Sequence, residues 1–256
     1  MILIGPAGTS GLGIIKGLEE VKRLKLDCLE CEFTYGVNMS NQTAKQAGEL
    51  AKKLNISLSV HCPYYINLAS MEKIKIKASI KRILESCERG FHLNAKYIVF
   101  HPGFYGKHTK EECYEIIKEG IIEMQKIIKE KKFNTVLCPE TAGKKSQFGS
   151  LDELTKLYKE TGCGICIDFA HLLARDGKVD YDDVMKKIEN IKEKTAHFSG
   201  IEYTEKGERR HILTKEKDIE KLLKSLKKHN IFIRIINESP NPVLDSLKTK
   251  KILDKI

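Results

Sequence analysis

The run KYIVF-His101 is one of six apolar runs that each end on a histidine or a carboxylate, and this series predicts the fold of the chain. The other five are SLSV-His61, TVLCP-Glu140, CGICI-Asp168, KTA-His197 and FIRIIN-Glu238. Parallel strands that close into a barrel bring their carboxyl ends to one face. Six such endings in series exceed what chance supplies, so they predict strands whose ends share one site.

Strand-like and helix-like segments alternate on both sides of these runs. Helical patterns follow the runs, for example over Met71–Phe91, where apolar residues recur with a 3.6-residue period. Only the residues after Ser199 look irregular. Eight strand–helix units predict an α/β protein with a single (β/α)8 TIM barrel over residues 1–256, and a doubly wound open sheet is the alternative. The expected strands are Ile2–Gly5, Cys28–Phe33, Ser57–His61, Tyr97–His101, Val136–Glu140, Gly164–Asp168, Ala196–Ser199 and Ile231–Glu238.

Composition limits the class of protein. A length of 256 residues suits one barrel, and a net charge of +10 favours a polyanionic partner such as nucleic acid, unless the lysines only solvate helix surfaces. The chain has neither an apolar run long enough to span a membrane nor a signal peptide. We therefore expect a soluble, cytoplasmic protein without a membrane partner.

The cysteines and glycines exclude two further kinds of site. Eight cysteines without a secretory signal indicate reduced thiols, and Cys28-x-x-Cys31 lies too far from Cys163-x-x-Cys166 for one zinc ribbon. We expect all eight to be buried structural thiols. The first strand is not followed by a G-x-G-x-x-G motif, so we expect no nucleotide cofactor.

The strand-end residues form a set of metal-ligand types. Imidazole and carboxylate ligands together suit Zn²⁺, with Mn²⁺ or Fe²⁺ as alternatives. Eight ligands exceed the needs of one tetrahedral ion, which favours two or three ions that share a bridging carboxylate, and such clusters suit phosphoester hydrolysis. Any one of these residues alone could instead be a buried polar residue or a helix cap. The set is His61, His101, Glu140, Asp168, His171, His197, His211 and Glu238.

These residues lie in motifs that resemble those of the endonuclease IV family of apurinic/apyrimidinic endonucleases, among the xylose-isomerase-like TIM barrels. The motifs follow the family's order from about residue 57 to 240. They are Ser59-Val-His61-Cys-Pro-Tyr64-Tyr-Ile-Asn67-Leu68, Phe100-His101-Pro102-Gly103, Glu140-Thr141-Ala142-Gly143, Cys166-Ile-Asp168-Phe-Ala-His171, His197, Arg210-His211 and Asn237-Glu238-Ser239-Pro240.

The resemblance implies a hydrolase, an endodeoxyribonuclease of base-excision repair with two or three Zn²⁺ ions. It would cut double-stranded DNA on the 5′ side of abasic sites and leave a 3′-hydroxyl, with Glu140, Asp168 and Glu238 as catalytic residues. The first ion would be held by His61, His101 and Glu140. The second would be held by Glu140, Asp168, His197 and Glu238, with Glu140 bridging. The third would be held by His171 and His211. The implied DNA contacts are Tyr64, Asn67 and Arg210, and we expect a monomer.

Two departures from the family pattern bear on the site. The family has an aspartate two residues before its last ligand histidine, where this chain has Arg209, and the nearest acid is Glu208. Either Glu208 reaches the third ion or that ion is weak or absent. The loop after the second strand lacks the family's arginine, so we expect Tyr35 or Met39 to wedge into a base step.

The second strand also carries two acids, Glu30 and Glu32, on one face. Glu32 either faces the mouth of the site or forms a salt bridge. Two other functions compete with the nuclease: a sugar isomerase or epimerase of the same superfamily, and a nucleic-acid-binding protein that has lost activity. Isomerase sites use fewer histidines and one or two ions, so the number of bound metal ions separates the three.

Overall fold

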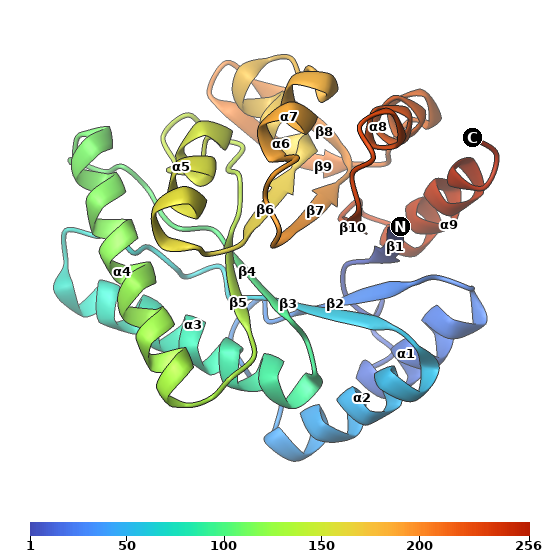
Figure 1. The fold of residues 1–256 in the computed structure, drawn as a ribbon, viewed down its shortest axis with the longest axis horizontal. Helices are drawn as coiled ribbons and strands as arrows, with labels where there is room; N and C mark the ends of the chain where they lie inside the picture. Colours follow the sequence, from blue (N-terminus) through green and yellow to red (C-terminus); the bar gives the residue numbers. More distant parts are fainter.

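The computed structural model describes residues 1–256 and is built around eight parallel strands (Figure 1). Two four-stranded sheets have the orders β1-β10-β7-β6 and β2-β3-β4-β5. The strand bounds lie close to the predicted ones. They are β1 Ile2–Pro6, β2 Cys28–Glu32, β3 Ser57–His61, β4 Tyr97–Phe100, β5 Val136–Pro139, β6 Ile165–Asp168, β7 Lys194–Phe198 and β10 Ile233–Asn237.

Parallel bridges join the two sheets into one barrel. Ala7 pairs with Glu30 between β1 and β2, and Glu140 pairs with Cys166 between β5 and β6. Gly5 permits the first junction, because a Cβ atom at this position would lie 1.8 Å from the Cys28 carbonyl oxygen. The (β/α)8 prediction is confirmed, and the open sheet is excluded.

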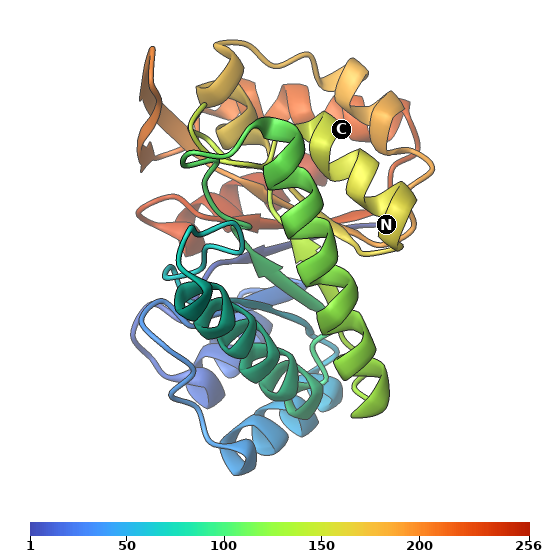
Figure 2. The ribbon, with the colours of Figure 1, turned by 90° about the vertical axis from the view of Figure 1, so that its left-hand side faces the viewer.

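Nine helices surround the strands (Figures 1 and 2). Their apolar faces pack on the barrel, as the 3.6-residue periodicity predicts. None has the length and apolar content needed to cross a membrane. The helices are α1 Ile14–Arg23, α2 Asn41–Leu54, α3 Lys73–Leu93, α4 Lys110–Glu130, α5 Leu151–Thr161, α6 Phe169–Asp176, α7 Tyr181–Ile188, α8 Glu216–Lys228 and α9 Pro242–Leu253.

The segment after Ser199, which the sequence suggested to be irregular, is an antiparallel hairpin of β8 (Gly200–Thr204) and β9 (Gly207–Ile212). Figure 2 shows it projecting on the side away from the two termini. Its exposed, charged residues lack the apolar alternation that identifies a strand in sequence, which explains the wrong prediction. The hairpin matters because it carries Glu208 and His211.

All eight cysteines are free and buried, as predicted. Burial raises the pKa of the Cys87 thiol to about 12 and that of the Cys163 thiol to about 11. These thiols pack as small apolar side chains in the core, and the two C-x-x-C motifs do not form a zinc site.

Candidate metal centre

The barrel brings the strand-end residues together at one end. His61 and Asp168 are the last residues of β3 and β6, and Glu140 follows β5 directly. His197 lies in β7, and Glu238 follows β10. The strand ends therefore meet at one end of the barrel, as predicted.

Glu140 is the centre of the arrangement and is fully buried. Its Oε2 lies 3.1 Å from His61 Nε2 and 3.5 Å from His101 Nε2. Its Oε1 lies 3.2 Å from His197 Nδ1 and 3.3 Å from His171 Nδ1. One carboxylate in contact with four imidazoles has the position expected of a bridging ligand.

Several groups of candidate ligand atoms lie within 4.8 Å of one another. These groups reproduce part of the ligand sets that the resemblance implies. Glu140, Asp168, His197 and Glu238 form one group, which is the set implied for the second ion. The first set is divided, because His61 groups with Glu140 and His197, while His101 groups with Glu140 and His171.

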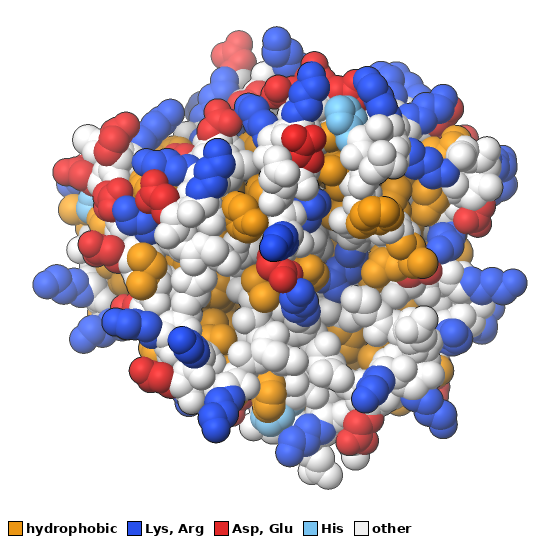
Figure 3. Space-filling model, viewed as in Figure 1, with side chains coloured by type: hydrophobic (Ala, Val, Ile, Leu, Met, Phe, Trp, Pro, Cys, Tyr) orange, Lys and Arg blue, Asp and Glu red, His pale blue; other side chains and the backbone are white.

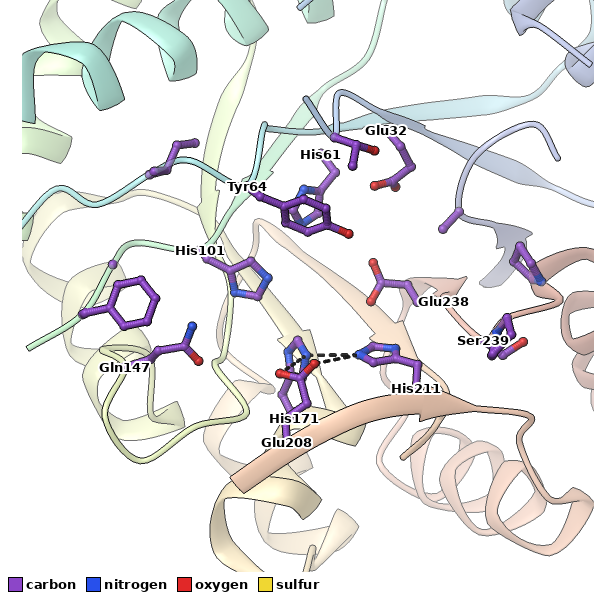
Figure 4. Close-up of a pocket in the computed structure, with 17 residues that line it drawn as sticks. Glu32, His61, Tyr64, His101, Gln147, His171, Glu208, His211, Glu238 and Ser239 are labelled. Atoms are coloured by element: carbon purple, nitrogen blue, oxygen red, sulfur yellow. Dashed lines mark hydrogen bonds and ion pairs between the residues drawn. The ribbon is translucent and has the colours of Figure 1, made fainter. Parts of the chain in front are cut away.

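The group implied for the third ion contains His171 and His211, whose Nε2 atoms lie 3.3 Å apart, together with Asp168. Glu208 also reaches this position, with Oε2 at 3.4 Å from His171 Nε2 and Oε1 at 3.6 Å from His211 Nε2 (Figure 4). The acid that departs from the family spacing thus lies beside both histidines.

A β-bulge explains how Glu208 and His211 share a face. Residues three apart on a regular strand point to opposite faces. In the hairpin Glu202 pairs with Arg210 and Tyr203 pairs with Glu208, so Arg209 is an extra residue without a partner. The extra residue restores the common face that a D-x-H spacing would give on a regular strand.

Backbone and hydroxyl oxygens hold three of the imidazoles at Nδ1. The Nδ1–H of His61 donates to the Cys62 carbonyl at 2.8 Å, and that of His171 donates to the Thr141 carbonyl at 2.9 Å. His211 Nδ1 bonds the Ser199 hydroxyl at 2.9 Å. His61 thus presents Nε2 to Glu140, and His171 and His211 present Nε2 to each other, which is how metal-binding histidines are usually fixed. Nδ1 of His171 also lies beside Glu140.

The electrostatics of the centre favour cations. Burial alone would raise the pKa of Glu140, but the imidazoles of His101 and His197 hold it well below its usual range. Burial also lowers the pKa of His101 to about 4, whereas Glu140 and Glu32 oppose burial at His61 and raise its pKa to about 10. Glu140 is therefore ionised, and the His61 ring holds a proton that a metal ion would displace, whereas the His101 ring is already neutral.

Asp168 shows that the residues fit a metal ion. Its Oδ1 accepts a hydrogen bond from the His171 N–H at 2.8 Å and caps α6, while its Oδ2 is buried and has no partner. A buried carboxylate oxygen without a donor is costly unless a cation takes that place. Imidazole and carboxylate donors together suit zinc or manganese.

The centre opens into a cavity of about 530 Å³. Tyr64 and Glu32 line this cavity, and Glu32 faces Glu238 (Figure 4). The prediction that Glu32 faces the mouth is confirmed. Burial raises the pKa of Glu32 to about 8, and the charges of Glu30 and Glu238 act in the same direction. Gln147 and Phe104 also line the cavity, and no sequence pattern had indicated them.

The other residues expected to contact DNA lie farther out. Tyr35 is 80% exposed on the loop after β2. Arg210 is exposed and forms an ion pair of 2.8 Å with Glu202 on the neighbouring strand. Asn67 Oδ1 accepts hydrogen bonds from the N–H of Ala69 in its own loop and from the N–H of Phe104 in the loop after β4.

A family profile described as a xylose isomerase-like TIM barrel matches residues 18–254. The chain belongs to this family. A protein of Methanocaldococcus jannaschii named uncharacterized protein MJ0133 is 36% identical over 100% of this chain and 98% of its own length. A probable endonuclease 4 of Carboxydothermus hydrogenoformans is 38% identical over 50% of this chain and 44% of its own length. Sequence similarity to endonuclease 4 is therefore strongest over part of the chain.

Solved structures of the family share the whole fold. Endonuclease IV from Thermus thermophilus has a TM-score of 0.70 and 17% identity, covering 100% of this chain and 98% of its own. A D-tagatose 3-epimerase-like protein has a TM-score of 0.75 and 19% identity, covering 99% of this chain and 96% of its own. At these identities the comparisons establish the barrel, and both chemistries occur on it.

Proposed function

We propose that this protein is a zinc-dependent DNA phosphodiesterase that hydrolyses the backbone on the 5′ side of abasic sites and leaves a 3′-hydroxyl. The observation that carries this proposal is the third ligand group, His171, His211 and Glu208. A sugar isomerase that uses one or two ions does not need a third ligand group. The relatives named probable endonuclease 4 support the same activity.

The residues of the centre have distinct roles in this reaction. Bound divalent ions supply Lewis acidity, which neutralises a phosphate and makes water a better nucleophile. Glu140 contacts imidazoles on both of its oxygens and would hold two ions at a fixed separation. The Glu238 side chain is 17% exposed at the cavity and would orient the attacking water. Asp168 belongs to the same ligand group and has a buried oxygen without a hydrogen-bond partner.

The loops that follow the strand ends provide contacts for a polyanion. Tyr64 and Tyr35 are 62% and 80% exposed and offer aromatic faces for stacking on bases beside a lesion. Figure 3 shows that cations and anions are interspersed over the face seen in Figure 1, so the excess charge is not confined to one part of that face. The exposed cations on the strand-end loops and the hairpin are Lys107, Lys144, Lys145, Lys206, Arg209 and Arg210.

An incision assay tests the proposal. The protein is stripped of metal, reloaded with Zn²⁺, Mn²⁺ or Mg²⁺, and mixed with a labelled duplex that contains one abasic analogue. We expect a single cut on the 5′ side that yields a 3′-hydroxyl. Glu140→Ala and Asp168→Ala should abolish cleavage and keep the native circular dichroism spectrum. Glu123→Ala, an exposed position on α4, is the matched control. Lack of incision with all three metals would refute the nuclease assignment.

A sugar epimerase is the second candidate, and one observation favours it. Glu32 places an additional carboxylate in the cavity opposite Glu238. Its raised pKa keeps this carboxyl largely protonated at neutral pH, so it would form hydrogen bonds with sugar hydroxyls. The same metal-loaded preparations should therefore be incubated with a panel of ketohexoses. Epimerisation without DNA incision would favour this candidate.

A further inference from the structure

Glu30 is a carboxylate inside the barrel, in the middle of β2, with 0% of its surface exposed. Its Oε1 lies 2.8 Å from Nε2 of His197, which is equally buried. Its Oε2 accepts a hydrogen bond of 2.6 Å from the Ser59 hydroxyl on the neighbouring strand. A buried carboxylate is strongly destabilising without such partners, so these two contacts fix its position.

The contact with Glu30 favours a proton on Nε2 of His197, because an ionised carboxylate only accepts hydrogen bonds. The other nitrogen, Nδ1, lies 3.2 Å from Glu140 Oε1 and 3.1 Å from Glu238 Oε1, so it also faces carboxylates. A cation between Nδ1 and these carboxylates would displace the proton from Nδ1, and Glu30 would keep the proton on Nε2.

His197 is oriented in the opposite way to the other anchored rings. His61, His171 and His211 are held at Nδ1 by carbonyl or hydroxyl oxygens and present Nε2. His197 is held at Nε2, by a charged group, and presents Nδ1. Glu30 is therefore the charged group that holds Nε2 of His197.

We propose that Glu30 is a positioning residue that fixes the tautomer and orientation of His197, so that Nδ1 serves as a metal ligand beside Glu140 and Glu238. This inference rests on the metal centre of the proposed function. It adds a β2 residue to the six strand ends, and this residue acts through His197 rather than on a substrate.

Zinc affinity measured against a chromophoric chelator tests the proposal without any DNA. Glu30→Met removes the acceptor but keeps the length of the side chain, and we expect it to weaken zinc binding about 10- to 100-fold. Glu30→Gln retains a carbonyl acceptor for Nε2–H and should restore most of the affinity. Glu49→Gln removes a carboxylate from the exposed face of α2, so it should bind zinc as the wild type does.

Two outcomes of the affinity measurement would overturn the proposal. One is a Glu30→Met variant with wild-type affinity and an unchanged absorption spectrum after cobalt loading. The other is an equal loss of affinity in Glu30→Met and Glu30→Gln, because this would show an effect of the lost charge rather than of a lost acceptor for Nε2–H.

A second measurement uses only the wild type, so it does not depend on the folding of a variant. Long-range ¹H–¹⁵N correlation spectra of the zinc-loaded protein identify the protonated nitrogen of His197. We expect the proton on Nε2, and a proton on Nδ1 would overturn the proposal. Wild-type protein that binds zinc in this way but does not incise abasic DNA would refute the nuclease and leave the role of Glu30 intact.

Discussion

At the scale of single residues, the identity of the third ligand group depends on Glu208. It lies beside both His171 and His211, and a cation at this place would bind its carboxylate. Gly143 makes room for the Glu208 side chain, because a Cβ atom at position 143 would lie only 2.8 Å from Glu208 Cβ.

Glu208→Ala should therefore lower the zinc content of the loaded protein by one equivalent per chain, because only His171, His211 and the Asp168 shared with the second group would remain to hold the ion. Elemental analysis after gel filtration measures the content. Glu205→Ala, an exposed change in the same hairpin, is the control. If Glu208→Ala keeps the wild-type zinc content, Glu208 is not a ligand.

The sequence identified the residues that meet at the strand ends but not their contacts. Strand ends in a parallel barrel converge whatever their spacing in the chain, so His61 and Glu238 could be assigned to one site from the pattern alone. The role of Glu30 could not be predicted, because its contact with His197 spans the inside of the barrel. The spacing of residues along the chain does not predict such a contact.

At the scale of elements, the β8–β9 hairpin brings Glu208 and His211, which are three residues apart, to the same face of the strand. The bulge at Arg209 lets ligands three residues apart share a face. Sequence patterns did not reveal the hairpin, since exposed charged strands lack apolar alternation. A regular hairpin would need a two-residue spacing.

Deleting Arg209 should produce that regular hairpin, with Glu208 and the histidine now two residues apart and still on one face. We expect the deletion to keep the wild-type zinc content. Inserting a second residue after Arg209 should turn Glu208 away and lower the content by one equivalent. The reverse pattern would show that the bulge does not set the face.

Helix α9 supports the hairpin through Asp245, which is fully buried. The carboxylate accepts hydrogen bonds from the Thr214 N–H at 2.8 Å and hydroxyl at 2.7 Å, and pairs with Lys248 at 2.7 Å. Burial opposes ionisation, but Lys248 and Thr214 together hold the pKa of Asp245 below its usual range.

This lowered pKa predicts how stability depends on pH. A carboxylate with a depressed pKa in the folded state stabilises above its unfolded pKa of about 4, and the effect is lost as the pH falls through the folded pKa. Asp245→Asn should lower the free energy of unfolding by about 3 kcal/mol at pH 7. The difference should shrink below pH of about 4. Urea unfolding across pH measures it, with the exposed Asp254→Asn as the control, and a difference independent of pH would contradict this account.

At the scale of the whole molecule, the barrel closes where β1 approaches β2, and Gly5 allows this approach. Gly5→Ala should lower the free energy of unfolding by about 3 kcal/mol or more, because the new methyl group meets backbone that cannot move aside. Gly120→Ala on α4 is the matched control, since its Cβ would have 4.0 Å of clearance from the nearest side-chain atom. Urea unfolding measures both, and equal effects would contradict the closure argument.

The overall barrel was the most predictable part of the molecule. Alternating strands and helices specify it through local patterns, whereas the division of the first ligand set between His61 and His101 depends on side-chain packing at the end of the barrel. A protein described as epimerase-like has the same barrel, so the fold does not determine the chemistry. Under the proposed function, the chemistry depends on the number of cations that the centre holds.

The zinc content of the wild-type protein tests this central claim most directly. The protein is stripped with a chelator, reloaded, passed through gel filtration and measured by elemental analysis. We expect two or three zinc ions per chain, and Glu140→Ala should lose more than one of them. A wild-type protein that retains no zinc would show that the converging histidines and carboxylates do not form a metal centre.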